Sequence, residues 1–129
     1  MKLMYNNTLL KINIKETEDN FGLKENDRWC LVHILIKNDE TNYEINKDIL
    51  TKKEITDTIN TINKFINNEI SSINIKYIKN FIKIHLLKKT NKKILELVLI
   101  EPKTQSNKTH KVYLEEQELL GFIKLLKGE

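Results

Sequence analysis

The stretch Trp29-Cys30-Leu31-Val32-His33-Ile34-Leu35-Ile36 decides the fold, because it is apolar almost without interruption. In a strand, successive side chains point to opposite faces, so this stretch has two largely apolar faces. One face carries Cys30, Val32, Ile34 and Ile36, and the other carries Trp29, Leu31, His33 and Leu35. Such a run is typical of a central strand that is covered on both sides. The sequence therefore predicts a sheet with residues 29–36 in its interior.

Strands are also predicted on both sides of this stretch. Leu10, Ile12 and Ile14 alternate with polar residues and predict a strand over residues 8–15. Asn38-Asp39-Glu40 is a turn sequence, and Tyr43 opens the returning strand of a hairpin. The polar and acidic residues 16–27 are expected to form a loop.

A helix follows the hairpin. Thr51-Lys52-Lys53-Glu54 has the pattern of a capping box, in which the threonine side chain and the glutamate side chain each bind the other residue's backbone N–H. One stripe of isoleucines recurs at helical spacing, namely Ile55, Ile59, Ile62 and Ile66. We expect this helix to end near Glu69.

The rest of the chain predicts four further strands, over residues 72–77, 80–88, 92–100 and 108–114, and a last helix over residues 115–127. That helix has a buried stripe of Leu119, Phe122, Ile123 and Leu126, with Gly128 as its cap. The expected order is βββ-α-ββββ-α. The sequence thus predicts an α+β fold: one antiparallel sheet of about six or seven strands with two helices mainly on one face. No internal repeat or linker is visible, so we expect a single domain over residues 1–129.

Composition indicates the compartment in which the protein is expected to act. The chain of 129 residues has a formal net charge of +4 and only one cysteine, Cys30. One cysteine forms no disulfide within the chain, which favours a reducing compartment. Residues 1–7 contain no apolar stretch typical of a signal peptide, and no apolar run is long enough to cross a membrane. We therefore expect a cytoplasmic protein.

No pattern of catalytic residues is apparent. His33, His85 and His110 are scattered outside any metal-binding spacing, and Cys30 in an apolar strand is expected to be a buried, inert thiol. Three glycines are too few for the usual phosphate-binding loop. The sequence predicts no enzyme activity, no metal and no cofactor.

Charge is distributed unevenly, and two binding surfaces are conceivable. Acidic residues gather in the loop before Trp29, namely Glu16, Glu18, Asp19, Glu25 and Asp27, and such a surface suits a basic protein partner. Residues 71–95 contain no acidic residue, and their lysines include Lys76, Lys79, Lys83, Lys88 and Lys89. With Tyr77 and Phe81 interleaved, this basic stretch has the character of a nucleic-acid surface. The other interpretation is that these lysines keep strand edges from aggregating.

The order of several short motifs resembles the WapI-like immunity proteins. These motifs are Asp27-Arg28-Trp29-Cys30-Leu31-Val32, the helix entry Leu50-Thr51-Lys52-Lys53-Glu54, Leu95-Glu96-Leu97, Ile100-Glu101-Pro102 and the closing helix from Leu119 to Leu126. The resemblance implies a protein that binds a cognate toxin domain of the WapA or Rhs contact-dependent type and occludes it stoichiometrically. It implies no catalytic residues. The identity of the toxin does not follow from the sequence.

Overall fold

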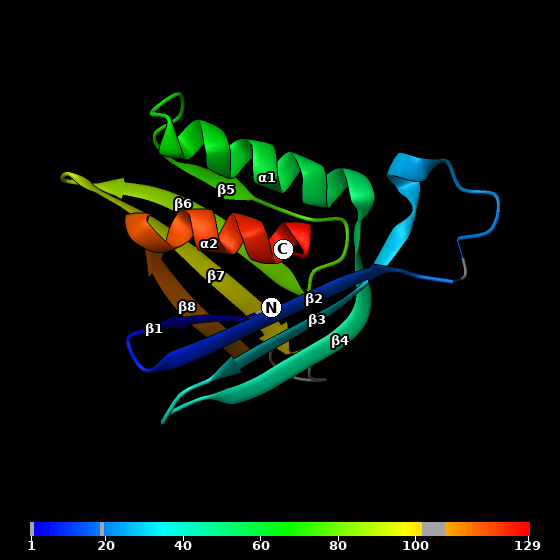
Figure 1. The fold of residues 1–129 in the computed structure, drawn as a ribbon, viewed down its shortest axis with the longest axis horizontal. Coiled ribbons are helices and arrows are strands. Elements are labelled where there is room, and N and C mark those ends of the chain that lie inside the picture. The colour runs from blue at the N-terminus through cyan, green and yellow to red at the C-terminus, as the bar shows by residue number, and fades with distance from the viewer. Residues whose placement is uncertain (1, 19, 102–107) are drawn as a thin grey trace.

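The computed structural model describes residues 2–18, 20–101 and 108–129. Within these residues the chain forms eight strands and two α-helices (Figure 1). The first half contains β1 (Lys2–Tyr5), β2 (Thr8–Glu16), β3 (Trp29–Lys37), β4 (Asn42–Thr51) and α1 (Lys52–Ile66), with a short 3-10 turn, η1 (Glu25–Asp27), between β2 and β3. The second half contains β5 (Ile73–Ile75), β6 (Ile82–Lys89), β7 (Lys92–Glu101), β8 (Lys108–Glu115) and α2 (Glu116–Lys127).

The strands form two sheets, and this corrects the expectation of a single sheet. The N-terminal sheet has the order β1-β2-β3-β4 and the C-terminal sheet the order β5-β6-β7-β8, with every neighbouring pair antiparallel. Short turns join strands only within each half. The helix α1 lies between β4 and β5 in the chain, so no hairpin joins these two strands. The strand β5 pairs with β6 in the second sheet and does not extend the first. The element order ββββ-α therefore occurs twice, although no repeat is visible in the sequence.

The strand β1 was not predicted. It is only four residues long and pairs with the first part of β2 through the turn Asn6-Asn7. Both asparagines have positive φ angles, 48° and 60°. Asparagine tolerates this left-handed region, and a two-residue turn of this kind matches the twist of the flanking strands. The Asn-Asn pair was thus the available signal for a hairpin.

Most of the other elements are confirmed. The capping box is present: the Glu54 N–H donates to Thr51 Oγ1 at 3.1 Å, and the Thr51 N–H donates to Glu54 Oε1 at 3.0 Å. The helix α1 ends at Ile66, three residues before the predicted Glu69. Gly128 caps α2 with a positive φ of 78°.

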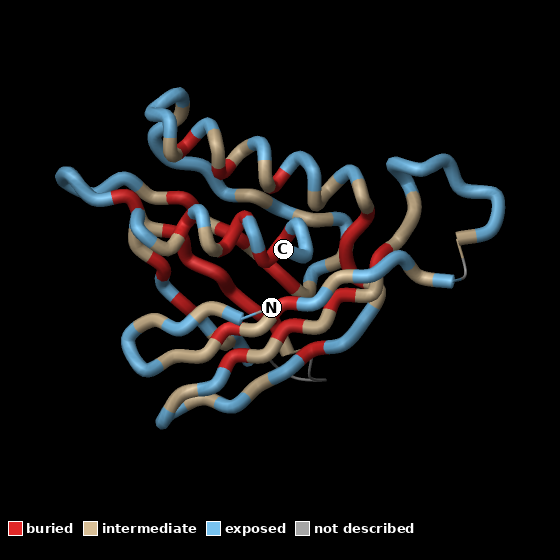
Figure 2. Tube along the Cα trace, viewed as in Figure 1, coloured by how far each residue is buried: buried red, intermediate tan, exposed pale blue. Residues whose placement is uncertain are grey.

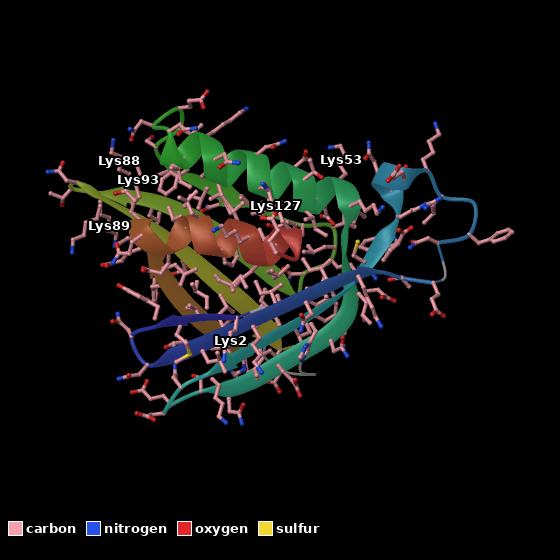
Figure 3. All side chains as sticks on the ribbon, viewed as in Figure 1. Lys2, Lys53, Lys88, Lys89, Lys93 and Lys127 are labelled. Carbon is pink, nitrogen blue, oxygen red and sulfur yellow. The ribbon has the colours of Figure 1, made fainter. Side chains whose placement is uncertain are left out.

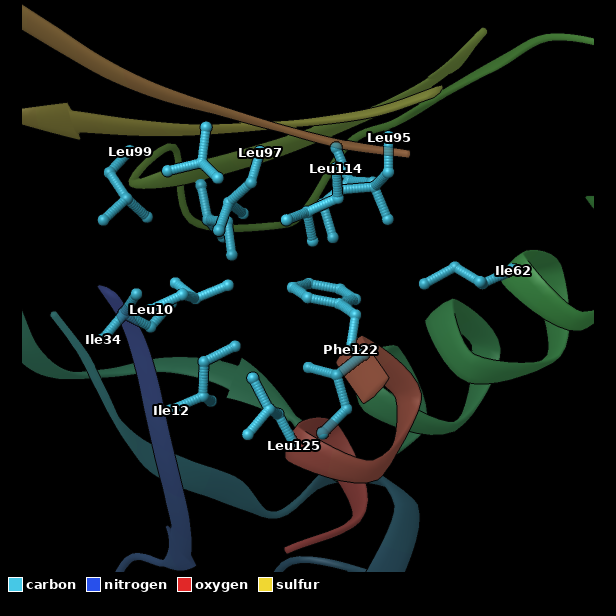
Figure 4. Packing of buried hydrophobic residues seen from close by; sticks show 14 of the residues in the cluster. Leu10, Ile12, Ile34, Ile62, Leu95, Leu97, Leu99, Leu114, Phe122 and Leu125 are labelled. Carbon is cyan, nitrogen blue, oxygen red and sulfur yellow. The ribbon is translucent and has the colours of Figure 1, made fainter. Parts of the chain in front are cut away.

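The two sheets and the two helices share one hydrophobic core. Figure 4 shows α2 between the sheets, where Phe122 points toward leucines of the C-terminal sheet. The helix α2 contacts β1 and β2 on one side and β7 and β8 on the other, and it also packs against α1. The helices therefore do not lie on one face of a single sheet. In Figure 2 the buried residues line this interior.

The strand β3 is interior, as predicted, but it is not covered on both faces. Cys30, Val32, Ile34 and Ile36 are at most 3% exposed, whereas the opposite face is only half-buried. On that face Leu35 lies between Lys11 and Glu44 on the neighbouring strands. The aliphatic parts of long charged side chains shield an apolar residue in this position, so no second layer is needed. No helix among the described residues is long and apolar enough to span a membrane.

Candidate partner-binding surface

The loop between β2 and β3, residues 17–28, extends beyond the rest of the molecule (Figure 1). We call it the overhang loop. Its neck is held by Asn20, whose Nδ2 donates to the carbonyls of Thr17 at 2.7 Å and Trp29 at 2.9 Å. The Trp29 N–H donates to Asn20 Oδ1 at 2.6 Å. One side chain thus closes the loop at its base, and the loop projects from a fixed position.

Two of the predicted acidic site residues belong to an ion-pair network that ties this region to α1. Glu16 lies 2.9 Å from Arg28 and 3.2 Å from Lys52, and Lys52 also lies 3.3 Å from Glu25. Hydrogen bonds from Lys52 and Arg28 lower the pKa of the Glu16 carboxyl. The same contacts, first with Glu16 and then with Glu25, raise the pKa of Lys52. Glu16 and Glu25 are therefore occupied in holding the overhang loop.

The other acidic candidates differ from these two. Glu18 and Asp27 are exposed, and neither forms an ion pair within the described residues. Both carboxylates are thus available to a partner. Asp19 lies outside the described residues. The structure therefore divides the acidic cluster: Glu16 and Glu25 are paired with Lys52, whereas Glu18 and Asp27 form no ion pair within the described residues, and all four are exposed.

Beside the overhang loop lies a hollow that the sequence did not reveal. Its volume is about 500 Å³, its apolar lining is Leu23, Trp29 and Ile78, and its acidic lining is Asp27, Glu54 and Asp57. We call it the Trp29 hollow. Ile78 is 75% exposed and Leu23 is 38% exposed, while Phe21 in the same loop is fully exposed at 100%. Leu23 and Ile78 thus expose apolar surface in the lining of the hollow, while Phe21 is exposed elsewhere in the overhang loop.

Contacts from separate parts of the chain shape the Trp29 hollow. Glu54 Oε2 accepts a hydrogen bond from the Ile78 N–H at 2.9 Å, so the helix cap also anchors the segment before β6. The ammonium group of Lys79 lies 4.2 Å from the centre of the Trp29 ring and donates to the Asp48 carbonyl at 2.5 Å. This cation–π contact fixes the tryptophan from one side. Because residues 54 and 78 are distant in the chain, only folding brings this lining together.

The predicted basic stretch does not form one surface. Its lysines lie at both ends of β6 and on different faces: Lys79 covers Trp29, Lys83 lies within the sheet, and Lys88 and Lys89 lie at the β6–β7 hairpin end (Figure 3). Lys76 is exposed between β5 and β6. Lys93 is buried, donating to the Ile66 carbonyl at 2.6 Å and lying 3.2 Å from Glu116.

The aromatic residues of this stretch are also engaged. The hydroxyls of Tyr77 and Thr58 are hydrogen-bonded at 2.7 Å, and burial raises the pKa of the Tyr77 phenol. The ammonium group of Lys47 lies 4.8 Å from the centre of the Phe81 ring. Neither ring is arranged as an open platform for stacking on bases.

Each histidine has a carboxylate partner, which the sequence did not indicate. His33 lies 2.7 Å from Glu44, His85 lies 3.0 Å from Glu96, and His110 lies 3.1 Å from Glu101. His110 also stacks on Tyr43, with ring centres 4.1 Å apart, which links the two sheets. No group of three or more histidine, cysteine, aspartate or glutamate side chains within the described residues is placed to hold a metal ion.

One of these pairs is part of a longer row. His85, Glu96 and Tyr113 lie directly opposite one another on β6, β7 and β8, and a hydrogen bond from Tyr113 to the 9% exposed Glu96 raises the pKa of the phenol. The row satisfies a nearly buried carboxylate, and Tyr113 at its end also lines a hollow of about 230 Å³ together with Leu3 and Leu114. Cys30 is buried, as predicted, and burial raises the pKa of its thiol.

Comparison with known proteins assigns the chain to no family. No family model matches the sequence, and no curated protein matches it. The resemblance to the WapI-like immunity proteins therefore stays a hypothesis, and the surface described above is the main guide to function.

Proposed function

We propose that this protein is an immunity protein, which binds a cognate bacterial toxin domain in the cytoplasm and neutralises it by covering it. The observation that carries the proposal is the Trp29 hollow together with the overhang loop. Exposed Leu23 and Ile78 offer apolar anchors in the lining of the hollow, and exposed Phe21 offers another in the overhang loop. The carboxylates of Glu18 and Asp27, which form no ion pair within the described residues, offer charge. The toxin as partner rests on the motif resemblance given above.

This surface has the composition of a protein-binding site. Binding energy in protein interfaces is concentrated in a few large side chains that fill hollows, with polar groups around them. Unpaired carboxylates at the rim favour a basic partner and increase the rate of encounter. The Asn20 contacts and the Glu16–Lys52–Glu25 pairs hold the overhang loop before binding, which reduces the entropy lost on association.

The test needs the toxic domain as its probe. A large gene immediately upstream is the expected source, and its C-terminal fragment would be expressed in bacteria with and without this protein. We expect the fragment to stop growth alone and growth to be restored by co-expression. Absence of rescue, with both proteins expressed and folded, would contradict the proposal.

Variants then locate the interface. Phe21→Ala and Ile78→Ala are each expected to weaken toxin binding by about tenfold or more, because each removes an apolar anchor. Leu120→Ala is the matched control, since Leu120 is 60% exposed on α2 and belongs neither to the overhang loop nor to the lining of the Trp29 hollow. Equal affinity of all three variants would remove the overhang loop and the hollow as the interface while leaving the rescue result intact.

The second candidate is a nucleic-acid-binding module that uses the lysines of residues 76–93. The observation that favours it is the exposed pair Lys88 and Lys89 with Lys92 at the β6–β7 hairpin. It predicts binding of mixed RNA or DNA that weakens steeply as salt rises. No binding at low salt would exclude it.

A further inference from the structure

The C-terminal sheet has an outer face that points away from the core. Its inner face carries Leu95, Leu97 and Leu99, which belong to the core cluster and lie toward α2 (Figure 4). Side chains alternate between the two faces of a strand, so Glu96 and Val98 of β7 lie on the outer face. Val98 is only 5% exposed and yet lies outside the core cluster, which agrees with this placement.

Two rings flank Glu96 on this outer face. His85 on β6 and Tyr113 on β8 lie opposite Glu96 in the sheet. The Nδ1 atom of His85 lies 3.0 Å from Glu96 Oε1, and the Tyr113 hydroxyl donates to the same carboxylate. Because the hydroxyl is at the far end of the ring, this hydrogen bond directs the Tyr113 ring across the sheet toward β7. Tyr113 is 53% exposed and the His85 side chain 32%, so one nearly buried carboxylate fixes two rings that remain open to solvent.

A lysine lies beside each ring. Lys83 precedes His85 by two positions on β6, and Lys111 precedes Tyr113 by two positions on β8. Both lysines lie opposite Val98. Lys111 and Tyr113 also belong to the lining of the hollow of about 230 Å³ at the edge of β8, so space for a ligand adjoins both side chains. The outer face therefore presents the same pair, a ring and a lysine, on both sides of β7.

Positive charge exceeds negative charge on this face. The charged residues on the outer faces of these three strands are Lys83, Lys89, Lys92, Glu96, Lys111 and Glu115. Both acidic side chains are engaged: Glu96 binds the two rings, and Glu115 lies 3.9 Å from Lys92 and accepts from the Tyr5 hydroxyl. Lys83, Lys89 and Lys111 form no ion pair within the described part of the chain. The excess of positive charge favours an anionic ligand.

The spacing of the two rings indicates a single-stranded nucleic acid. Residues on β6 and β8 are two strand spacings apart, which is roughly 10 Å. Bases within one strand of a duplex are stacked only about 3.4 Å apart. Bases that contact both Tyr113 and His85 must therefore be splayed apart, which a single strand permits and a duplex does not. An acidic protein segment would use the lysines and leave the rings without a role.

We propose that the outer face of the C-terminal sheet binds a short stretch of single-stranded nucleic acid. Its bases stack on Tyr113 and His85, and its phosphates bind Lys83 and Lys111. The proposal takes up the second candidate function at a surface other than the β6–β7 hairpin, and it is independent of the immunity function.

The probes are fluorescently labelled single strands of about ten nucleotides, one of deoxythymidylate and one of uridylate. Fluorescence anisotropy with the full chain at low salt measures both affinities, and the tighter strand identifies DNA or RNA as the source. An abasic strand of equal length keeps the phosphates and loses the bases, and we expect it to bind at least about tenfold more weakly. No binding of either probe, or equal binding of the abasic strand, would overturn the proposal. A polyglutamate peptide that binds as tightly as the nucleic acid would also overturn it, because an acidic protein segment would then be the occupant.

Two variants of Tyr113 isolate the contribution of the ring. Tyr113→Ala and Tyr113→Phe both lose the hydrogen bond to Glu96, and only the alanine variant loses the ring. We expect Tyr113→Ala to weaken binding about tenfold or more, and Tyr113→Phe to bind within about threefold of the wild type. Phe21→Ala removes a fully exposed ring of the overhang loop and should have no effect. Equal losses in the two Tyr113 variants, or a loss in Phe21→Ala, would overturn the assignment.

Lysine variants test the phosphate contacts. The slope of log affinity against log salt is about 0.7 per phosphate contact for a single strand, so Lys83→Gln with Lys111→Gln should reduce the slope by about 1.4. Lys24→Gln with Lys64→Gln makes the same change in net charge at exposed positions outside this face, and should leave the slope unchanged. Amide chemical shifts should change at residues 83–85, 96–98 and 111–113. Equal slopes for the two double variants, or shifts confined to the β6–β7 hairpin, would overturn the proposal.

Discussion

At the scale of single residues, the carboxylates of Glu54 and Glu16 each connect separate segments of the chain. Glu54 closes the cap of α1 and also binds the Ile78 N–H, so one side chain joins the helix to the segment before β6. Glu16 joins Arg28 and Lys52 at the base of the overhang loop. Both residues lie beside the proposed interface, and both serve the structure.

Glu54→Ala is expected to lower the free energy of unfolding by about 1–2 kcal/mol, because it removes the cap and leaves the Ile78 N–H without this partner. Urea denaturation measures the loss. Asp57→Ala is the control, since it removes only the exposed pair with Lys53 on the same helix and should cost no more than about 0.5 kcal/mol. Equal losses for the two variants would contradict the role of Glu54.

The Glu16 contacts should make stability depend on pH. The folded-state pKa of Glu16 is lowered, so its contribution is fully present above the ordinary glutamate pKa of 4.5 and is lost as pH falls through the folded-state pKa. Glu16→Gln should therefore be less stable than the wild type near neutral pH, and the difference should shrink in acid. Denaturation curves over this pH range measure it. A difference that stays constant down to strongly acid pH would contradict the assignment.

At the scale of elements, the overhang loop depends on its neck. Asn20 makes three hydrogen bonds there, two to carbonyl groups and one to the Trp29 N–H. The loop itself contributes little to the core, since Phe21, Leu23 and the residues of η1 are exposed. Its conformation is thus fixed at the neck and by the ion pair between Glu25 and Lys52 of α1.

Asn20→Ala is expected to cost about 1–3 kcal/mol and to speed amide hydrogen exchange in residues 21–27, while the β2–β3 pairing persists. Asn26→Ala is the control in the same loop, because Asn26 is exposed and makes no side-chain hydrogen bond within the described residues. Unchanged exchange in Asn20→Ala would show that other contacts hold the loop.

At the scale of the whole molecule, α2 joins the two sheets. Phe122 is fully buried and belongs to the core cluster shared by both sheets (Figure 4). The Tyr43–His110 stack makes a second link between the sheets. Loss of packing at Phe122 should therefore affect both halves of the chain together.

Phe122→Ala is expected to destabilise the protein by about 3–5 kcal/mol through the cavity it leaves. Trp29 fluorescence reports on the N-terminal sheet and far-ultraviolet circular dichroism on the whole chain, and the two unfolding curves should coincide. Leu120→Ala, exposed on the same helix, should leave stability nearly unchanged. Separate transitions for the two probes would show that the sheets unfold independently.

Local elements were largely predictable because their signals are local. The alternation around Ile12, the capping box at Thr51 and the glycine at position 128 each depend on neighbouring residues, and each predicted feature is present. The short β1 was missed because four residues carry little periodicity. The candidate surface was half predicted: the acidic residues were identified, but not the pairing that occupies Glu16 and Glu25.

The sequence by itself determined the order of the main strands and helices, the buried face of β3 and the burial of Cys30. Only the tertiary structure decided that the strands form two sheets, because hydrophobic alternation specifies which face is buried and not which edges pair. The candidate functional surface is likewise decided only by the tertiary structure. The Trp29 hollow brings together Leu23, Glu54 and Ile78. It depends on distances between residues far apart in the chain, which no local pattern encodes.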